Sequence, residues 1–137
     1  MSSDKPSVLF VCRRNGGKSQ MAAGLMHKHA GERIDAHSAG TDPGETINQL
    51  SAESLLEVGV DVTSERPKAI DPELLHSVNR VVILGREAKL PSTEDVHVEY
   101  WDTDEPSERG IDGIERMRLI RDDIADRVQQ LAEDMLS

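Results

Sequence analysis

The chain has 137 residues, of which 36% are hydrophobic and 31% charged, and its formal net charge is −10. This length and composition suit one compact domain over residues 1–137, with 1–6 as a flexible N-terminus. The acidic balance and an aromatic content of 2% argue against a nucleic-acid-binding protein, which usually presents a basic face. No window reaches the apolar length of a membrane span, and the first residues are too polar for a secretory signal. We therefore expect a cytoplasmic protein that binds neither nucleic acid nor membranes.

The first half of the chain predicts two strands and two helices. Its expected elements are a strand at 8–12, a helix that begins at Lys18 or Ser19 and stops at Gly31, a strand at 34–38, a turn-rich loop at 38–44 and a helix at 47–58. The strands are short apolar runs, whereas the helices carry apolar residues every three or four positions, with Leu50 and Leu56 on the apolar face of the second helix.

The second half continues the alternation of strands and helices. Its expected elements are an irregular stretch at 60–69, a short helix capped by Asp71, a strand at 80–84, a more exposed strand at 96–100, an acidic loop at 101–106 and a long amphipathic helix from Ile111 to Met135. The strand at 80–84 is apolar on every side, which suits the centre of a parallel sheet. The alternation predicts a doubly wound α/β fold, in which ligands bind beyond the carboxyl ends of the strands.

The loop after the first strand has the features of an anion site. A glycine-containing turn between a strand and a helix aims backbone N–H groups and the positive end of a helix dipole into one concavity. Gly17-Lys18-Ser19 matches the second half of a nucleotide-binding P-loop, but Cys12 stands where the first glycine is required. The strand at 80–84 also runs into Gly85 without a carboxylate for Mg²⁺, so nucleotide binding is disfavoured.

Cys12 is the only cysteine in the chain, and it is either an inert core residue or a reactive thiol. The helix N-terminus, the loop N–H groups and the cations Arg13, Arg14 and Lys18 all favour the thiolate form. Ser19 is positioned to donate a hydrogen bond to the sulfur, and Lys18 to neutralise a bound oxyanion. An inert thiol would not need this polar loop, so we interpret Cys12 as a nucleophile.

The sequence resembles the low-molecular-weight tyrosine phosphatase superfamily, and most closely its arsenate reductase branch. The matching residues are Val8-Leu9-Phe10-Val11-Cys12, Asn15, Ser19-Gln20-Met21-Ala22, Ser38-Ala39-Gly40, Asn48, Trp101 and Pro106. The resemblance implies a four-stranded parallel sheet in the order 2-1-3-4 with helices on both faces.

The resemblance also implies roles for the residues of the loop. Cys12 is the nucleophile, Asn15 shapes the loop and Ser19 supports the thiolate. The oxyanion, arsenate or a phosphate-like ion, is held by the stretch that runs from Arg13 through Arg14, Asn15, Gly16 and Gly17 to Lys18. Arg13 and Arg14 are also candidates to contact an acidic or sugar-bearing thiol.

Two departures from the family pattern affect the chemistry. Lys18 replaces the family arginine, so a point charge on a flexible stem replaces a planar bidentate grip. Glu105 stands where the family has the aspartate before Pro106 that serves as general acid. Asp104 and Asp102 lie beside it as substitutes, and each of these carboxylates has an ordinary alternative as part of a solvated turn.

A third departure concerns the thiols. Gly17 and Gly85 stand where thioredoxin-coupled relatives carry further cysteines. Cys12 therefore has no second cysteine in the chain with which to form a disulfide. The chain is therefore similar to the single-cysteine arsenate reductases of actinobacteria. This similarity implies mycothiol as thiol cosubstrate, mycoredoxin as a protein partner and no tightly bound cofactor.

His27 and His29 lack a zinc-like spacing, so no metal is expected. The alternatives are a low-molecular-weight protein tyrosine or aryl phosphatase and a non-catalytic oxyanion-binding module.

Overall fold

The computed structural model describes residues 5–85, 88–90 and 96–137. The elements are β1 (Ser7–Cys12), α1 (Lys18–Ala30), β2 (Asp35–Gly40), α2 (Gln49–Leu56), α3 (Pro72–Ser77), β3 (Arg80–Leu84), β4 (Val98–Trp101) and α4 (Gly113–Leu136), with short 3₁₀ helices at Gly31–Arg33 and Pro106–Arg109. Residues 1–4 of the predicted flexible N-terminus lie outside the described residues. The backbone carbonyl of Pro6 already accepts a hydrogen bond of 2.9 Å from the Asp35 N–H, so ordered structure begins before β1.

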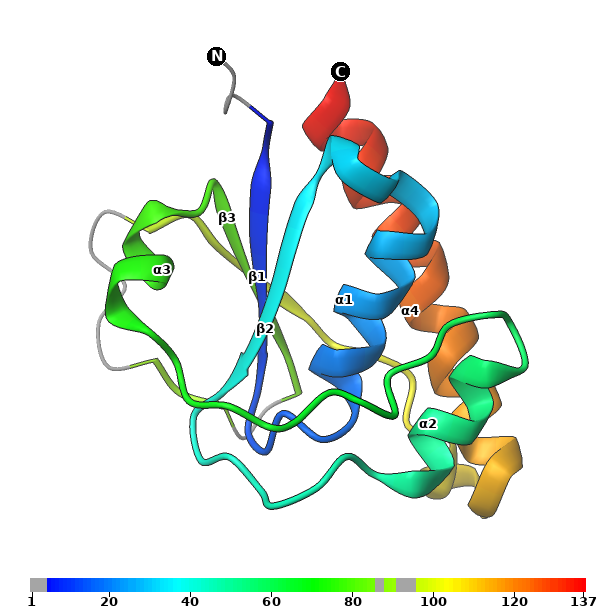
Figure 1. The fold of residues 1–137 in the computed structure, drawn as a ribbon. Helices are drawn as coiled ribbons and strands as arrows, with labels where there is room; N and C mark the ends of the chain where they lie inside the picture. The colour runs from blue at the N-terminus through cyan, green and yellow to red at the C-terminus, as the bar shows by residue number, and fades with distance from the viewer. Residues whose placement is uncertain (1–4, 86–87, 91–95) are drawn as a thin grey trace.

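The four strands form one parallel sheet in the order β2-β1-β3-β4, which confirms the predicted topology (Figure 1). β1 pairs with β2 from Ser7↔Asp35 to Cys12↔Gly40 and with β3 on its other side. The strand predicted at 34–38 extends further than expected, and the turn predicted at 38–44 is wrong for Ala39 and Gly40, which continue β2 alongside the end of β1. Parallel pairing with a buried neighbour outweighs the turn propensity of these small residues.

Two further boundaries differ from the prediction. α2 begins at Gln49 because Asn48 is its N-cap, with its side chain accepting a 2.9 Å hydrogen bond from the Ser51 N–H. Leu50 and Leu56 are 36% and 49% exposed, so the predicted apolar face of this helix is narrower than expected. The strand predicted at 96–100 is displaced to β4, which ends at the buried Trp101.

Helices cover both faces of the sheet, as predicted. α1, α2 and α4 lie on one side and α3 on the other (Figure 1). Successive residues of β1 point to opposite faces: Val8 and Phe10 belong to the core beneath α1 and α4, while Leu9 and Val11 belong to the core beneath α3. All four are fully buried, and each apolar side chain contributes about 1.5–3 kcal/mol by leaving water. The strand that ends at Cys12 is thus fixed on both sides.

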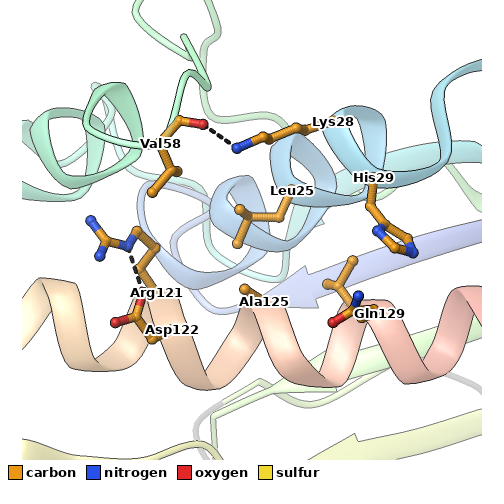
Figure 2. Close-up of a pocket in the computed structure, with 9 residues that line it drawn as sticks. Leu25, Lys28, His29, Val58, Arg121, Asp122, Ala125 and Gln129 are labelled. Carbon is orange, nitrogen blue, oxygen red and sulfur yellow. Dashed lines mark hydrogen bonds and ion pairs between the residues drawn. The ribbon is translucent and has the colours of Figure 1, made fainter.

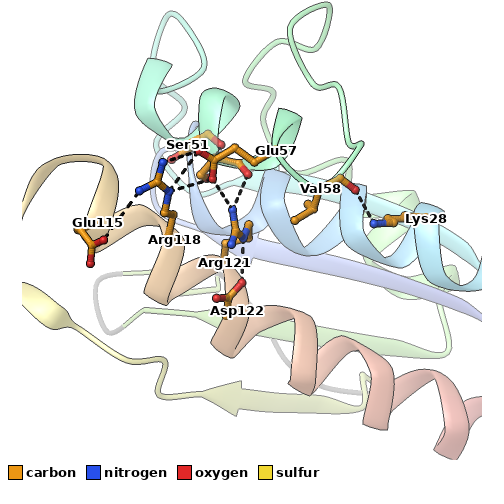
Figure 3. Close-up of polar contacts among 9 residues, drawn as sticks. Lys28, Ser51, Glu57, Val58, Glu115, Arg118, Arg121 and Asp122 are labelled. Carbon is orange, nitrogen blue, oxygen red and sulfur yellow. Dashed lines mark hydrogen bonds and ion pairs between the residues drawn. The ribbon is translucent and has the colours of Figure 1, made fainter.

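A network of ion pairs joins the end of α2 to α4. Arg118 donates to both carboxylate oxygens of Glu57 at 2.6–3.2 Å, and Arg121 donates to one of them at 2.8 Å (Figure 3). The hydrogen bond from Arg118 lowers the pKa of Glu57 to about 2, with a smaller contribution from Arg121, although partial burial opposes the shift. This pairing ties the segment after α2 to the longest helix of the protein.

The Glu57 network predicts a pH-dependent stability. Because folding lowers the pKa of Glu57 from 4.5 to about 2, its contribution is complete above the higher value and disappears as the pH falls through the lower one. Glu57→Gln is expected to lower the unfolding temperature at neutral pH, and the difference from wild type should vanish in strong acid. Thermal melts followed by circular dichroism across this range measure both. Glu53→Gln, an exposed change on α2, is the control, and a difference that persists in strong acid would contradict the assignment.

In the described part of the chain, no helix is long and apolar enough to cross a membrane.

Candidate active site

The loop between β1 and α1 turns sharply at Asn15. This residue is fully buried and adopts φ = 56°, a left-handed conformation that residues other than glycine rarely adopt. The turn brings the start of α1 back over the end of β1, so that Ser19 comes to lie beside Cys12. The strand, loop and helix predicted from the sequence are therefore present, with α1 beginning at Lys18.

Two hydrogen-bonding groups contact the sulfur of Cys12. The Ser19 Oγ lies 2.9 Å from the Cys12 Sγ, and the Asn15 backbone N–H donates to the same sulfur over 3.2 Å. The Asn15 Nδ2 in turn donates to the Ser19 Oγ at 2.7 Å. Cys12 is only 8% exposed, so these contacts form at the floor of the loop, where solvent competes weakly for them. The surroundings of Cys12 are polar, unlike those of an inert core thiol.

The segment that follows β2 supports the loop from the side. The N–H groups of Thr41, Asp42 and Gly44 donate to the backbone carbonyls of Cys12, Arg13 and Arg14 at 2.8–3.1 Å. Gly40 approaches the loop still more closely, because a Cβ at this position would lie 2.7 Å from the Arg13 carbonyl oxygen. The absence of a side chain at Gly40 therefore lets two backbone segments pack against each other.

The three cations of the loop are placed differently from one another. Arg13 and Arg14 are exposed, and the Asp42 carboxylate lies 3.5 Å and 3.1 Å from their guanidinium groups. Lys18 is only 24% exposed, and its Nζ lies 4.0 Å from Glu105. Lys18 is thus the more enclosed cation, whereas the two arginines lie at the rim.

The predicted general acids are both held in ion pairs. Glu105 accepts hydrogen bonds of 2.7 Å and 2.9 Å from Arg116, and this contact lowers the pKa of Glu105 to about 2, against a desolvation that raises it. Arg109 donates in the same way to the two carboxylate oxygens of Asp104, at 2.8 Å and 3.0 Å, and this hydrogen bonding lowers the pKa of Asp104. Both carboxyl groups are therefore ionised at neutral pH and carry no proton to donate in this arrangement.

The acid role of these carboxylates stays a prediction, and it requires the ion pair to open first. The third candidate, Asp102, follows β4 directly, and its backbone carbonyl accepts a 2.9 Å hydrogen bond from Arg127 of α4. None of these partner arginines was foreseen from the sequence. Each lies at an exposed or partly exposed position in the last segment of the chain. Charged residues are frequent there, and no sequence feature shows which of them form ion pairs.

A cavity of about 480 Å³ lies beside the loop. Its walls come from the loop at Gly16, Gly17 and Lys18, from α1, from the chain before α2 and from α4 at Arg116 and Met117. The cavity therefore has both charged and apolar groups in its walls, next to the start of α1. It leaves room for a second reactant beside an oxyanion held in the loop.

A second cavity, of about 350 Å³, lies between α1 and α4 and has no wall from the loop (Figure 2). Leu25 and His29 of α1 face Ala125 and Gln129 of α4 across it. His27 and His29 are both exposed, consistent with the interpretation of these histidines as surface residues.

The loop, the strand order and the surrounding elements define a known class of protein. The family model for low molecular weight phosphotyrosine protein phosphatases matches residues 7–136. The chain therefore belongs to this family.

Within the family, the chain is similar to proteins named arsenate reductase. It is 31% identical to the arsenate reductase of Bacillus licheniformis over 137 residues, which cover 94% of this chain and 96% of the relative. It is 32% identical to that of Halalkalibacterium halodurans over 139 residues, which cover 95% and 97% of the two chains.

Solved structures show the same likeness. The thioredoxin-dependent arsenate reductase of Corynebacterium glutamicum superposes with a TM-score of 0.81 at 28% identity, covering 99% of this chain and 64% of that longer chain. The arsenate reductase of Archaeoglobus fulgidus superposes with a TM-score of 0.76 at 28% identity, covering 92% of this chain and 98% of the other. The resemblance seen in the sequence is confirmed for the fold and for the arsenate reductase branch.

Sequence reasoning did not assign roles to several residues that shape the site. Gln20 is 3% exposed and bonds to Asn15, and the backbone N–H of Lys68 also bonds to Asn15. A signal existed for Gln20, which is a polar residue on the buried face of a predicted helix directly after Ser19. No comparable signal marks Asp42 or Lys68, because their contacts depend on how distant segments meet.

Proposed function

We propose that this protein is an arsenate reductase that acts as an arsenate–mycothiol transferase. The observation that carries the proposal is a single buried cysteine whose sulfur contacts two hydrogen-bonding groups of a glycine-containing loop, in a chain with no second cysteine. Its similarity to curated arsenate reductases over 94–95% of the chain supports arsenate as the oxyanion. The lack of an internal thiol partner supports an external thiol.

The first step is a substitution at arsenic. Arsenate occupies the loop from Arg13 to Ser19, where Lys18 and the backbone N–H groups offset its charge. The Cys12 thiolate forms a sulfur–arsenic bond, and one arsenic–oxygen bond breaks as hydroxide leaves and takes up a proton to become water. Arsenic stays pentavalent in this step. The proton comes from solvent or from Glu105 once its ion pair with Arg116 has opened.

The second step transfers the arsenic to an external thiol. The mycothiol thiolate forms a new sulfur–arsenic bond while the bond to Cys12 breaks, which returns the Cys12 thiolate and releases the arseno-thiol adduct. Reduction follows away from this chain. A mycoredoxin thiolate attacks the mycothiol sulfur of the adduct, a mixed disulfide forms, and the electron pair of the broken sulfur–arsenic bond stays on arsenic as trivalent arsenite. The cavity of about 480 Å³ beside the loop offers space for the incoming thiol.

The choice of thiol is the prediction that tests this proposal. Arsenite release is expected when the protein is given arsenate, mycothiol, mycoredoxin and a reductant for mycoredoxin, with a rate that falls to the uncatalysed level when mycothiol is left out. A parallel reaction with thioredoxin and thioredoxin reductase but no small thiol should give no arsenite above background. Turnover that is supported by thioredoxin alone, or no turnover in either mixture, would overturn the transferase proposal.

A phosphatase activity is the second candidate, and the family match favours it. Para-nitrophenyl phosphate hydrolysis without any added thiol separates the two candidates. Efficient hydrolysis together with no arsenite release assigns the protein as a phosphatase. Phosphate binding without either reaction assigns it as a non-catalytic oxyanion-binding module.

A further inference from the structure

The side-chain amide of Asn15 has an orientation that its neighbours determine. Its Oδ1 lies 3.0 Å from the backbone nitrogen of Lys68, which can only donate a hydrogen bond. The same Oδ1 accepts from the Gln20 Nε2 at 3.1 Å. The oxygen end of the amide therefore points toward these two donors, and the Nδ2 end points toward Ser19.

The orientation of Asn15 leaves the hydroxyl proton of Ser19 available for Cys12. The Ser19 Oγ accepts the Asn15 Nδ2–H at 2.7 Å, and the hydroxyl group has a single proton of its own. The Cys12 Sγ lies 2.9 Å from that oxygen, and Ser19 is fully buried. A thiolate sulfur can only accept hydrogen bonds, so with Cys12 ionised the proton of Ser19 is directed at the sulfur. Together with the Asn15 N–H at 3.2 Å, it gives the sulfur two donors, an arrangement that stabilises a thiolate over a thiol.

Gln20 holds Asn15 at two points. Its Nε2 lies 3.1 Å from the side-chain Oδ1 and 3.2 Å from the backbone carbonyl oxygen of Asn15, and it reaches the Arg66 carbonyl at 3.4 Å. Gln20 is 3% exposed and sits in the first turn of α1. It thus connects the loop, the helix and the chain segment before α3, and it supports the left-handed turn that Asn15 adopts at φ = 56°.

We propose that Gln20 is a positioning residue for Cys12: by fixing the Asn15 amide and backbone, it directs the Ser19 proton and the Asn15 N–H at the Cys12 sulfur. Gln20 does not contact the sulfur, so it acts through Asn15. This role concerns the state of the nucleophile and does not depend on which oxyanion or thiol the protein uses.

Gln20 is neutral, so replacing it with another neutral residue leaves the charges around Cys12 in place. Charged side chains on the loop, on the segments packed around it and on the wall of the cavity beside it are those of Arg13, Arg14, Lys18, Asp42, Glu65, Arg66, Lys68, Glu105 and Arg116. A change in the titration of Cys12 in a Gln20 variant therefore reports hydrogen bonding rather than a lost or gained charge. The carboxylate variant Gln20→Glu does add a charge, and it serves only as a second, stronger perturbation.

The single cysteine makes the test direct. The rate of alkylation by iodoacetamide, measured against pH, follows the thiolate fraction of Cys12 alone. Gln20→Met, which keeps the length of the side chain and removes its donors, is expected to raise the midpoint of this profile by about one pH unit, and so to slow alkylation about ten-fold below the midpoint. The plateau rate at high pH, where the thiol is fully ionised, should stay at the wild-type value. Gln130→Met, at an exposed position of α4, is the matched control.

A double-variant comparison separates positioning from a general loss of structure. Asn15→Gly tolerates the left-handed turn and removes the side chain through which Gln20 acts. In that background, Gln20→Met is expected to slow alkylation by clearly less than it does alone, because only the bond from Gln20 to the backbone carbonyl of residue 15 remains. Circular dichroism confirms that each variant is folded, and the neutral variant Gln20→Leu replaces Gln20→Met if the latter does not fold.

Three results would overturn the proposal. The first is a Gln20→Met midpoint equal to that of wild type. The second is a change in the plateau rate without a change in midpoint, which would show a structural role only. The third is an undiminished effect of Gln20→Met in the Asn15→Gly background. All of these measurements use iodoacetamide and no arsenate, so their outcome is separate from that of the arsenate assay.

Discussion

Cys12→Ser is expected to lower kcat/KM for arsenate reduction by at least about 10³-fold, because a neutral hydroxyl group is a far weaker nucleophile than a thiolate. The measurement is arsenite release with mycothiol and mycoredoxin at saturating thiol. The substitution exchanges sulfur for the smaller oxygen at a residue that is 8% exposed, so it leaves the loop without a clash. Phosphate binding, followed by titration calorimetry, is expected to be retained.

The phosphate measurement makes the Cys12→Ser result interpretable. Retained binding with lost turnover shows that the sulfur performs the chemistry and that the loop still holds an oxyanion. Loss of both would point to a collapsed loop, and an unfolding experiment would show it. Turnover within about ten-fold of wild type would exclude Cys12 as the nucleophile.

Gly40→Ala is expected to disrupt the loop although Gly40 lies on β2. The added Cβ would lie 2.7 Å from the Arg13 carbonyl oxygen and 3.0 Å from both the backbone nitrogen and the Cβ of Asn15. These are mostly backbone atoms that other hydrogen bonds hold, including the 2.8 Å bond from the Asp42 N–H to the Arg13 carbonyl. The loop must shift, and we expect a loss of about 1–3 kcal/mol in the free energy of unfolding and of about 10²-fold in turnover.

The control for Gly40→Ala is Gly44→Ala on the same side of the loop. A Cβ at Gly44 would meet nothing closer than 3.9 Å, which is ordinary van der Waals contact. Its free energy of unfolding is expected to stay within about 0.5 kcal/mol of wild type, as measured by urea denaturation. Equal losses in the two variants would show that the close approach of Gly40 does not matter.

The elements of the fold that the sequence could predict are those with a strong local pattern. The run that ends at Cys12 and the helix that stops at Gly31 follow from apolar spacing and a helix-ending glycine. The strand order 2-1-3-4 came with the family resemblance. The extension of β2 beyond Ser38 to Gly40 could not be predicted from propensity, because it depends on pairing with β1.

The candidate site shows the same division. The local stretch from Cys12 to Ser19 carried enough chemistry to be assigned from the sequence. The ion-pair partners of its charged residues could not be assigned from the sequence. An arginine on an exposed turn of a helix has no sequence feature that shows which carboxylate it pairs with. The pairing of Glu105 with Arg116 is the main example, because it changes the expected protonation of a residue that the sequence marked as an acid.

The solitary sulfur of this chain also determines how the protein responds to oxidants. A peroxide that converts Cys12 to a sulfenic acid creates a group that ordinarily condenses with a neighbouring thiol. The 137 residues contain no other cysteine, so no internal disulfide can protect the oxidised sulfur from further oxidation to the sulfinic acid. Recovery then depends on capture by a small thiol from solution. In the transferase mechanism proposed above, one small thiol would thus govern both the lifetime of Cys12 under oxidative stress and the rate of its reaction.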